Sequence, residues 1–508
     1  MKGRSGYRTA LLLLLFLALA LRLALVARGG QRYFPDENRY LRCFILMRHL
    51  GRGETGAAVD YVLDNADHTG FILVGLVPAL VHRGLLGALG LPVTRESLDE
   101  TLWIPAALLS VSSVVCIALV HAIARRAGAD EPEALAAAFL MASSASMFYF
   151  ARHLLPYDAS MALALGALWV GLNPQAGLGR SLAVGGLAGA ALLTYNGYGL
   201  SAFAVVGLHA AWGGPKAPDF LRRAAAAVAG LAALPLTLML ASRGRGLEPY
   251  LRKMSRFSRG ASTQTDFHEG WSLPWAYLWH AEHGLLVALL IGAVAVLWLS
   301  RRSSPAAARG LWWMGTAAAM YVAFVVLSNG LERIGTFGRL ARQLVPLLSL
   351  SAGSAAAALA SSPARRKALL AVAALIAIQA TFNFAPPLRM RFPREVDREV
   401  TAVYGEISHD TTVVLGRSDE RTVVPGSRYV LLNARYLYPI RGLKAPPPGR
   451  TLFAVAHPVQ FLPYQYEGYV PEERARLRAH DVSMQMIDTA VVLPFARVPP
   501  DPREDDPR

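Results

Sequence analysis

Apolar residues in this chain are gathered into long runs, such as Ala10 to Val26 and Ala368 to Ala380, which charged residues, glycine or proline interrupt. An α-helix needs roughly 20 apolar residues to cross the hydrocarbon core of a bilayer, so this pattern predicts a polytopic membrane protein with about 11 spans. We place the spans near residues 9–28, 101–124, 132–151, 158–173, 181–195, 198–213, 223–242, 274–299, 310–328, 340–360 and 368–385.

The apolar stretch from Phe71 to Leu91 does not fit this series. It contains Pro78, His82 and Arg83 together with several glycines. A crossing here would also reverse the sidedness of everything that follows. We interpret the stretch as a dipping or juxtamembrane segment beside the bundle.

Basic residues between the runs predict the side of each loop, because cytoplasmic loops retain Lys and Arg. Lys2, Arg4 and Arg8 keep the N-terminus in the cytoplasm, and the first span then places residues 29–69 outside. The later basic clusters fall inside: Arg125 with Arg126, Arg180, Lys216 with Arg222 and Arg223, Arg301 with Arg302, and Arg365 to Lys367. We therefore expect a multi-pass protein of the inner (plasma) membrane with a periplasmic or extracellular C-terminal region.

The pattern changes near residue 389, where Pro, Arg and acidic residues become frequent. We predict a transmembrane domain over 1–388 with an outer loop at 29–69, a small α/β extramembrane domain over 389–498, and a disordered tail over 499–508. The fold class is mainly α, a polytopic helical bundle with this α/β addition. The β-rich runs are Thr411–Leu415, Arg428–Leu437, Thr451–Ala456 and Ala490–Phe495, and a helical stretch covers Pro471–Ala479.

Composition agrees with the bilayer as solvent, because 54% of the 508 residues are apolar and the mean hydropathy is +0.34. The net charge of +16 does not indicate nucleic acid, since retention of basic loops in the cytoplasm accounts for it. Cys43 and Cys116 are the only cysteines, one behind a polar loop and one within an apolar run, so we expect no disulfide. The sequence has no glycine-rich phosphate loop, and we expect no nucleotide cofactor.

The first outer loop carries the run PDENRY at residues 35–40. Neighbouring carboxylates point in different directions, so one can take a proton from a bound hydroxyl while the other holds substrate or metal, with Arg39 steadying the pair. Asp36 and Glu37 are therefore candidate catalytic residues, and Arg39 and Tyr40 are candidate substrate contacts. The alternative is an ordinary helix N-terminus, where acids favour the dipole and proline suits the first turn.

A second outer turn carries the run RHLLPYD at residues 152–158. Asp158 lies at a helix terminus close to membrane depth, where an unpaired carboxylate is costly. We expect a partner for it, such as Arg152, His153 or a metal ion, and we take Arg152 and His153 as candidate substrate contacts. The alternative is that Asp158 caps the following helix.

A long loop near the middle of the chain is rich in arginine, although our topology places it outside. Arg252, Arg256 and Arg259 fall at helical spacing, so one face can present guanidinium groups to a lipid phosphate or diphosphate. Adhesion to anionic headgroups is the alternative. Arg339 and Arg342 precede a late apolar span and would lie at the interface, where phosphate is found; snorkelling is the alternative there.

In motif and order the sequence resembles the lipid-phosphate-dependent membrane glycosyltransferases of the GT-C superfamily, particularly the branch of the protein O-mannosyltransferases and the lipid A aminoarabinose transferase. The resemblance rests on Pro35–Tyr40 after the first span, Ala151–Asp158 after the third and Arg339–Leu348 late in the membrane region. It covers roughly residues 1–385.

This resemblance implies that Asp36 is the general base, that Glu37 is a supporting ligand and that Asp158 completes the site. It also implies a polyprenyl-phosphate sugar donor, transfer with inversion, and a divalent cation near the donor phosphate, for which Asp36 and Asp158 are the candidate ligands. Arg339 and Arg342 match the phosphate contacts.

Two departures from the family pattern concern the donor side of the site. The chain has DHTG at residues 67–70 where related transferases often have Lys-Pro-Pro, and Asn196-Gly197 where they have Lys-Gly. Either His68 takes the place of the lysine as a substrate contact, or the transferred sugar carries different groups.

The chemistry is coherent on the residues alone, because a glycosyl phosphate carries its own leaving group and needs only a base on the acceptor and positive charge on the phosphate. We expect a cell-envelope glycosyltransferase that moves a hexosyl or pentosyl group from a polyprenyl-phosphate donor to a lipid, glycan or protein acceptor. A transporter or lipid flippase is the alternative, and it predicts charges scattered at mid-membrane depth. An inactive scaffold would tolerate loss of the outer acids.

Overall fold

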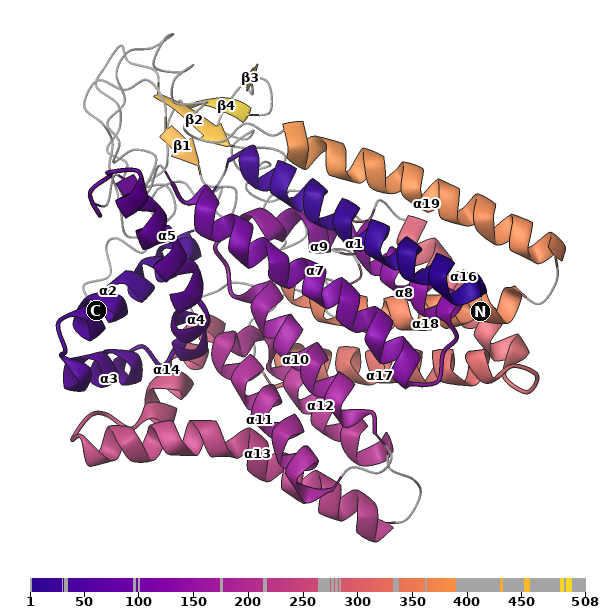
Figure 1. Cartoon of the computed structure of the whole chain (residues 1–508), viewed down its shortest axis with the longest axis horizontal. Helices are drawn as coiled ribbons and strands as arrows, with labels where there is room; N and C mark the ends of the chain where they lie inside the picture. The colour runs from indigo at the N-terminus through magenta and orange to yellow at the C-terminus, as the bar shows by residue number, and fades with distance from the viewer. Residues whose placement is uncertain are drawn as a thin grey trace.

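The computed structural model describes residues 2–29, 31, 35–94, 97–98, 101–173, 177–212, 217–263, 275, 278, 282, 285–331, 338–360 and 363–389, together with four strands between residues 430 and 495. Helices dominate these residues and lie side by side in one bundle (Figure 1). The predicted mainly α, polytopic fold is therefore confirmed.

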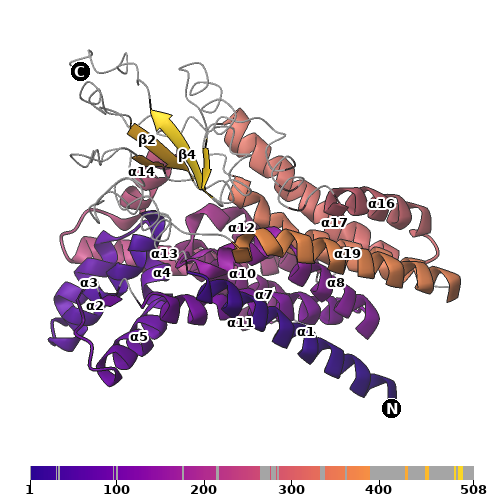
Figure 2. The same cartoon turned by 90° about the horizontal axis from the view of Figure 1, so that it is seen from above.

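Long helices make up the body of the bundle, and Figure 2 shows α1 and α19 running along its outside. The long helices are α1 (Lys2–Ala27), α7 (Trp103–Arg126), α8 (Glu131–Ser143), α10 (Tyr157–Gly171), α11 (Leu178–Thr194), α12 (Gly199–Trp212), α13 (Ala217–Gly244), α16 (Leu285–Ser300), α17 (Pro305–Val325), α18 (Val345–Leu359) and α19 (Pro363–Arg389).

The remaining helices connect them, and several of these gather at one end of the bundle (Figure 1). They are η1 (Pro35–Tyr40), α2 (Leu41–Gly51), α3 (Thr55–Asp64), α4 (Thr69–Val74), α5 (Leu76–Ala88), α9 (Ala145–Tyr149), η2 (Phe150–Arg152), η3 (Asn196–Tyr198), α14 (Tyr250–Thr263), η4 (Val326–Gly330) and η5 (Gly338–Leu344).

Six helices in the described part of the chain are long and apolar enough to cross a membrane, and a bent pair, α8 with α9, makes up to seven. The chain is thus a multi-pass membrane protein. One of the six is Thr69–Ala88, formed by α4 and α5, so the segment interpreted as dipping has the length and composition of a span. Other predicted spans are shorter helices, such as α10 with 15 residues, and the total of about 11 stays a prediction.

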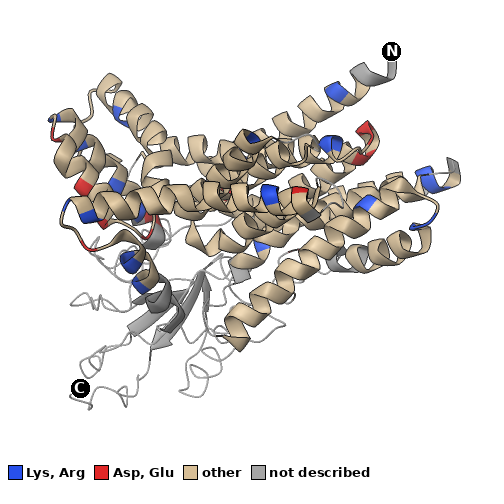
Figure 3. Ribbon diagram, turned by 90° about the horizontal axis from the view of Figure 1, so that it is seen from below, with Lys and Arg blue, Asp and Glu red and all other residues tan. Residues whose placement is uncertain are grey.

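Charged residues are most frequent at the two ends of the bundle, and a smaller number lie on the helices between them (Figure 3). This separation suits a bilayer, because a charge at mid-depth is costly. The described residues also include charges buried inside the bundle, among them Arg22 of α1 and the pair of Asp158 and Arg342.

Helices α11 and α13 pack backbone against backbone. A Cβ added at Gly185 would lie 1.9 Å from the carbonyl oxygen of Ala227, and one at Gly230 would lie 2.2 Å from that of Leu182. Only glycine permits this approach, as is common between membrane helices. The close contact fixes α11, whose C-terminal end leads into the candidate site.

The apolar run predicted as one span over 132–151 is broken, and α8 and α9 meet at Ser144 with a bend of 60°. The carboxylate of Glu282 is buried at this break and accepts from the backbone N–H groups of Ala145 and Ser146 at 2.8 and 3.0 Å. The hydroxyls of Ser144 and Ser146 donate to the same carboxylate at 2.7 and 2.9 Å. These bonds satisfy the first turn of α9 and hold it at an angle to α8.

The strands form one sheet in the order β1-β2-β4-β3, with β1 and β2 parallel and the other pairs antiparallel. The strands are β1 (Val430–Leu432), β2 (Leu452–Ala456), β3 (Gln485–Ile487) and β4 (Ala490–Phe495). β1, β2 and β4 fall within three of the predicted β-rich runs, whereas β3 was not predicted. The run Thr411–Leu415, the helical stretch Pro471–Ala479 and the tail 499–508 lie outside the described residues, and the limits of the C-terminal domain stay a prediction.

Candidate active site

Segments far apart in the sequence meet at one end of the bundle. Glu37 from η1 contacts the turn that leads into α10, where its Oε1 accepts from the backbone N–H of Leu154 at 2.7 Å. Arg342 from η5 forms an ion pair with Asp158 in the first turn of α10. The segments at residues 35–40, 152–158 and 339–342 thus form one region, as the order of the motifs predicted.

Glu37 holds this region together. Its side chain is fully buried, and its Oε1 lies 3.4 Å from Nδ1 of His153 as well as accepting from Leu154. A buried carboxylate engaged in this way fixes the backbone that it binds. The contact supports the expected auxiliary role of Glu37 beside Asp36 more than a proton-transfer role of its own.

The partner of Asp158 is Arg342, whereas the sequence led us to expect Arg152, His153 or a metal ion. Arg342 is fully buried, donates to the hydroxyl of Tyr198 at 3.2 Å and lies 4.7 Å from the centre of the Phe150 ring. Asp158 and Arg342 are both removed from water, so each carries the countercharge that the other needs.

Arg22 is a charged residue of this region that the sequence analysis missed. It lies in α1, is fully buried, and donates from Nε to the hydroxyl of Ser113 at 2.8 Å and from Nη1 to the carbonyl oxygen of Ala18 at 3.1 Å. Its guanidinium also lies 5.9 Å from the centre of the Phe148 ring. An arginine within the apolar run of a first span was the signal, because such a residue needs polar partners inside the bundle.

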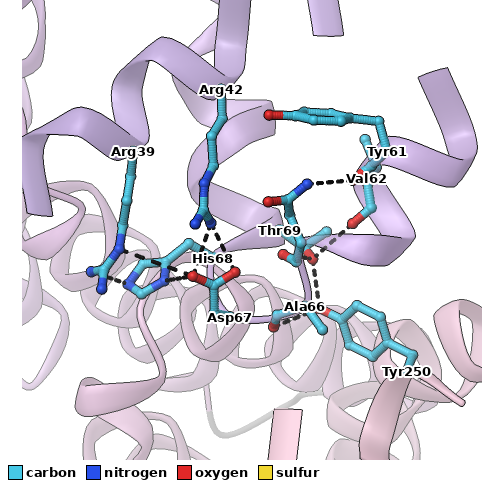
Figure 4. A network of polar contacts seen from close by, with 10 residues as sticks. Arg39, Arg42, Tyr61, Val62, Ala66, Asp67, His68, Thr69 and Tyr250 are labelled. Atoms are coloured by element: carbon cyan, nitrogen blue, oxygen red, sulfur yellow. Dashed lines mark hydrogen bonds and ion pairs between the residues drawn. The ribbon is translucent and has the colours of Figure 1, made fainter. Parts of the chain in front are cut away.

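A second polar network joins residues 39–69 to Tyr250 of α14 (Figure 4). Nη1 of Arg39 lies 2.9 Å from Nε2 of His68, and Nδ1 of His68 lies 3.2 Å from Oδ2 of Asp67. Nη1 of Arg42 donates to both oxygens of Asp67 at 2.8 Å. Burial opposes ionisation of Asp67, but the hydrogen bond from His68 and the guanidinium of Arg42 outweigh it and hold the pKa of Asp67 below its usual range.

Helix α14 covers this network. The ring of Phe257 lies 5.7 Å from that of His68 and 5.9 Å from the guanidinium of Arg39. Burial raises the pKa of Tyr250 to about 12, so its hydroxyl stays protonated and donates to Oγ1 of Thr69 at 2.8 Å. The aromatic residues of α14 therefore lie against the first outer loop.

The arginines predicted to face a lipid phosphate lie on the exposed side of α14. Arg252 and Arg256 are both exposed, and Arg256 forms an ion pair with Glu248. Lys253 pairs with Asp64 of α3. Acidic neighbours thus offset part of the charge that the sequence suggested, and the side chain of Arg259 lies outside the described residues.

Three further candidate contacts are buried beneath this region. The hydroxyl of Tyr40 lies 3.3 Å from Nδ1 of His82, and its ring packs in the core. Arg152 and His153 are buried beside Tyr149, with the guanidinium 5.9 Å and the imidazole 5.5 Å from the centre of the tyrosine ring. All three side chains are therefore part of the packed interior.

For Asp36 and Arg339 the structure describes the backbone but not the side chain. Asp36 belongs to η1, which packs against α4, and Arg339 belongs to η5, which packs against α9 and η3. Their side chains lie outside the described residues, and their predicted roles stay predictions.

Within the described ranges no group of three His, Cys, Asp or Glu residues is arranged to hold a metal ion. Asp158 is neutralised by Arg342, which would have to leave before a cation could bind. The metal role of Asp36 and Asp158 therefore stays a prediction.

No family model matches the sequence, and no curated protein matches it. Several solved structures are similar in architecture. Two show the oligosaccharyltransferase of Archaeoglobus fulgidus. The apo form is 15% identical, with a TM-score of 0.43 over 74% of this chain and 55% of that chain. The form tethered with an acceptor peptide containing the NVT sequon is 14% identical, with a TM-score of 0.37 over 72% of this chain and 53% of that chain.

The third structure is ArnT from Cupriavidus metallidurans in the apo state, at 14% identity and a TM-score of 0.48 over 97% of this chain and 98% of that chain. This chain therefore spans about half of the oligosaccharyltransferase and nearly all of ArnT. Both proteins are members of the GT-C superfamily. At these identities and TM-scores the likeness is remote.

Proposed function

We propose that this chain is an inverting glycosyltransferase that moves a sugar from a polyprenyl-phosphate donor in the bilayer to an acceptor at the outer face of the cytoplasmic membrane. The observation that carries the proposal is the convergence of the acidic outer loop, the turn before α10 and the late arginine segment at one end of a membrane bundle. These are the segments that hold the candidate base and the candidate phosphate contacts.

The proposed reaction needs one proton acceptor and positive charge near the leaving phosphate. Glu37 is committed to the backbone of Leu154, so we assign the proton transfer to Asp36. Asp36 takes the proton of the acceptor group as its heteroatom bonds to the anomeric carbon. The bond from that carbon to the phosphate oxygen breaks on the opposite face, and the electron pair leaves with the polyprenyl phosphate.

Arginines near this end supply the positive charge. Arg39 is 19% exposed and lies in the outer network with His68 and Asp67, so it is our first choice for the donor phosphate. Arg339 and Arg342 are our second choice for the donor phosphate. Arg342 can serve only if it exchanges Asp158 for the phosphate, because the two form a buried pair in this structure.

The direction and the partners of the reaction are also proposals. We place the N-terminus in the cytoplasm and the C-terminal region in the periplasm or outside the cell, so the acceptor approaches from outside. A lipid, a glycan or a protein can provide the accepting group. No nucleic acid takes part.

The first test compares the purified parent protein with Asp36→Asn in transfer of radiolabelled sugar from a mixed polyprenyl-phosphate donor pool to membrane acceptors. We expect the parent to transfer label and the variant to lose at least about 100-fold in rate, because a general base contributes roughly that factor or more. Both proteins should insert and fold equally.

The matched control is Glu54→Gln, which alters an exposed acid of the same outer segment that pairs with His49. It should transfer label like the parent. Undiminished turnover by Asp36→Asn would remove the catalytic assignment. No label from the parent would favour the transporter, which flux of labelled lipid through proteoliposomes would then detect.

A further inference from the structure

We propose that Gln343 is a positioning residue that anchors η5 to η3 and α12 and thereby fixes the position of Arg342 in the candidate site. Gln343 belongs to η5 and follows Arg342 directly in the chain. It takes no part in the proposed reaction steps. The inference rests on the proposed function in one respect, which is that Arg342 contacts the anionic donor.

The amide of Gln343 is buried, and all four of its hydrogen-bonding positions are used. Its Oε1 accepts from the backbone N–H of Ser201 at 3.2 Å and from the hydroxyl of Ser201 at 3.0 Å. Its Nε2 donates to the carbonyl oxygens of Gly197 at 3.1 Å and of Leu340 at 3.2 Å. A backbone N–H can only donate and a carbonyl can only accept, so these partners fix which end of the amide is the oxygen.

These hydrogen bonds join three elements. Ser201 lies in the first turn of α12, where a backbone N–H has no acceptor within its own helix, so Gln343 caps α12 from outside. Gly197 belongs to η3, and Leu340 belongs to η5 itself. The Gln343 side chain therefore fixes η5 against the turn that connects α11 to α12.

This turn is itself tightly packed. A Cβ added at Gly197 would lie 2.6 Å from Cε1 and Cζ of Tyr195, so the turn rests directly on the tyrosine ring. That ring in turn lies 4.7 Å from the ring of Tyr157 and 5.0 Å from the ring of Tyr198. The carbonyl group of Gly197 is thus a fixed acceptor for Gln343.

Arg342 binds the same turn through a different residue. It donates to the hydroxyl of Tyr198 at 3.2 Å and forms the ion pair with Asp158. Two consecutive residues of η5 therefore contact η3, one at the backbone of Gly197 and one at the side chain of Tyr198. Because Gln343 holds the backbone of η5, Arg342 can exchange Asp158 for the donor phosphate by rotation of its side chain alone.

Two substitutions at position 343 separate the anchor on η3 from the cap on α12. Gln343→Met keeps the approximate size of the side chain and loses all four hydrogen bonds. Gln343→Glu keeps an acceptor for Ser201, and a carboxylate at the start of α12 suits the helix dipole. A carboxylate cannot donate, however, so its second oxygen opposes the carbonyl oxygens of Gly197 and Leu340.

In the transfer assay both variants should raise the KM for the donor roughly 10-fold. This is near the lower end of the cost of losing a hydrogen bond to a charged group, because Arg342 is displaced and not removed. The kcat should change little, since Asp36 is unaltered. Gln379→Met is the matched control and should keep the parent's KM, because the amide of Gln379 donates to Asn383 within α19 at 2.8 Å.

An unchanged donor KM in Gln343→Met would overturn the proposal. A KM that rises in Gln343→Met but not in Gln343→Glu would assign the effect to the cap on α12, and it would also contradict the anchoring role. Ser201→Ala removes one of the four hydrogen bonds and leaves the link to η3, so its effect on the KM should be smaller than that of either variant.

The closing experiment is a double-mutant cycle of chemical unfolding in detergent, which does not depend on catalysis. Gln343→Met is introduced into the parent and into the double variant Asp158→Asn with Arg342→Gln. We expect it to lower the denaturant midpoint in both, and by clearly less in the double variant, because no ion pair is left there to weaken. Equal shifts of the midpoint would overturn the proposal.

These readouts also separate the two proposals. If the parent transfers no label, the proposed function fails, but the unfolding cycle still decides whether Gln343 positions Arg342. If transfer occurs and the two midpoint shifts are equal, the proposed function survives and Gln343 loses its positioning role.

Discussion

Asp158 and Arg342 are separated by 184 residues in the chain, yet they form a buried pair. The sequence predicts that Asp158 needs a partner, because a carboxylate near membrane depth is costly without one. It does not identify that partner, since Arg152 and His153 are nearer in sequence and carry the same chemistry. At the scale of the residue, therefore, the need for a countercharge is predictable and its source depends on the tertiary fold.

Removing one member of this pair should cost more than removing both charges. We expect Arg342→Ala to lower the free energy of unfolding by about 3 kcal/mol or more, because it leaves a buried carboxylate alone. The double variant Asp158→Asn with Arg342→Gln should lower the free energy of unfolding by less than Arg342→Ala does. Chemical unfolding in detergent measures both.

Arg256→Ala is the control for that measurement, because Arg256 is exposed and pairs with Glu248 at the surface. We expect Arg256→Ala to lower the free energy of unfolding by no more than about 1 kcal/mol. Equal losses in the buried and the exposed variants would show that burial of the Asp158 pair is not what makes it necessary.

The break between α8 and α9 shows what sequence patterns omit at the scale of the element. Residues 132–151 form one apolar run, so hydropathy predicts one straight span. The bend depends on Glu282, which is more than 130 residues away in the chain and binds the first turn of α9. Sequence patterns also miss part of the surroundings of α14. The helical spacing of its arginines was predicted correctly, but its acidic neighbours Glu248 and Asp64 were not.

Glu282→Ala should loosen α9. The variant leaves two backbone N–H groups and two hydroxyls without their buried acceptor, and each such group costs about 1–3 kcal/mol. We expect a clearly lower unfolding midpoint and reduced transfer, since η2 and the turn to Asp158 follow α9 directly. Differential scanning fluorimetry with the transfer assay measures both.

Ser144→Ala tests whether that effect passes through the break, because its hydroxyl donates to Glu282 at 2.7 Å. In the Glu282→Ala background the serine change should add little. Glu131→Ala, which alters a partly exposed acid beside Arg125, is the control and should leave the midpoint nearly unchanged. A stable, fully active Glu282→Ala would contradict the role assigned to this carboxylate.

At the scale of the whole molecule, hydropathy and basic loops predict a multi-pass helical protein, and the order of the motifs predicts that they meet at one end. The number of spans is harder to predict, because helices such as α10, with 15 residues, are buried among neighbours and need not have the full length of an isolated span. Strand β3 was missed because QMI is too short a run to show alternation.

Topology can be measured with fused reporters. Alkaline phosphatase, which is active only outside the cytoplasm, should be active when joined after Gly90 or Gly246 and inactive after Arg126. Green fluorescent protein should give the reverse pattern. We expect these outcomes because the basic loops should lie in the cytoplasm and residues 71–91 should not cross the membrane.

The phosphatase fusion after Gly90 decides whether α4 and α5 cross the membrane. Their combined helix, Thr69–Ala88, has the length and composition of a span. An inactive phosphatase after Gly90 together with an active one after Arg126 would show that it crosses and that the sidedness of the later loops must be revised.

The cysteines described above give the folded protein an unreactive thiol background. Cys43 and Cys116 are both free and fully buried, and burial raises the pKa of Cys43 to about 12, which suppresses the thiolate that reacts with electrophiles. The natural chain can therefore carry a single added surface cysteine for maleimide dyes or spin labels without removal of its own two. Because both native thiols emerge when the bundle opens, their alkylation also reports how often the protein unfolds.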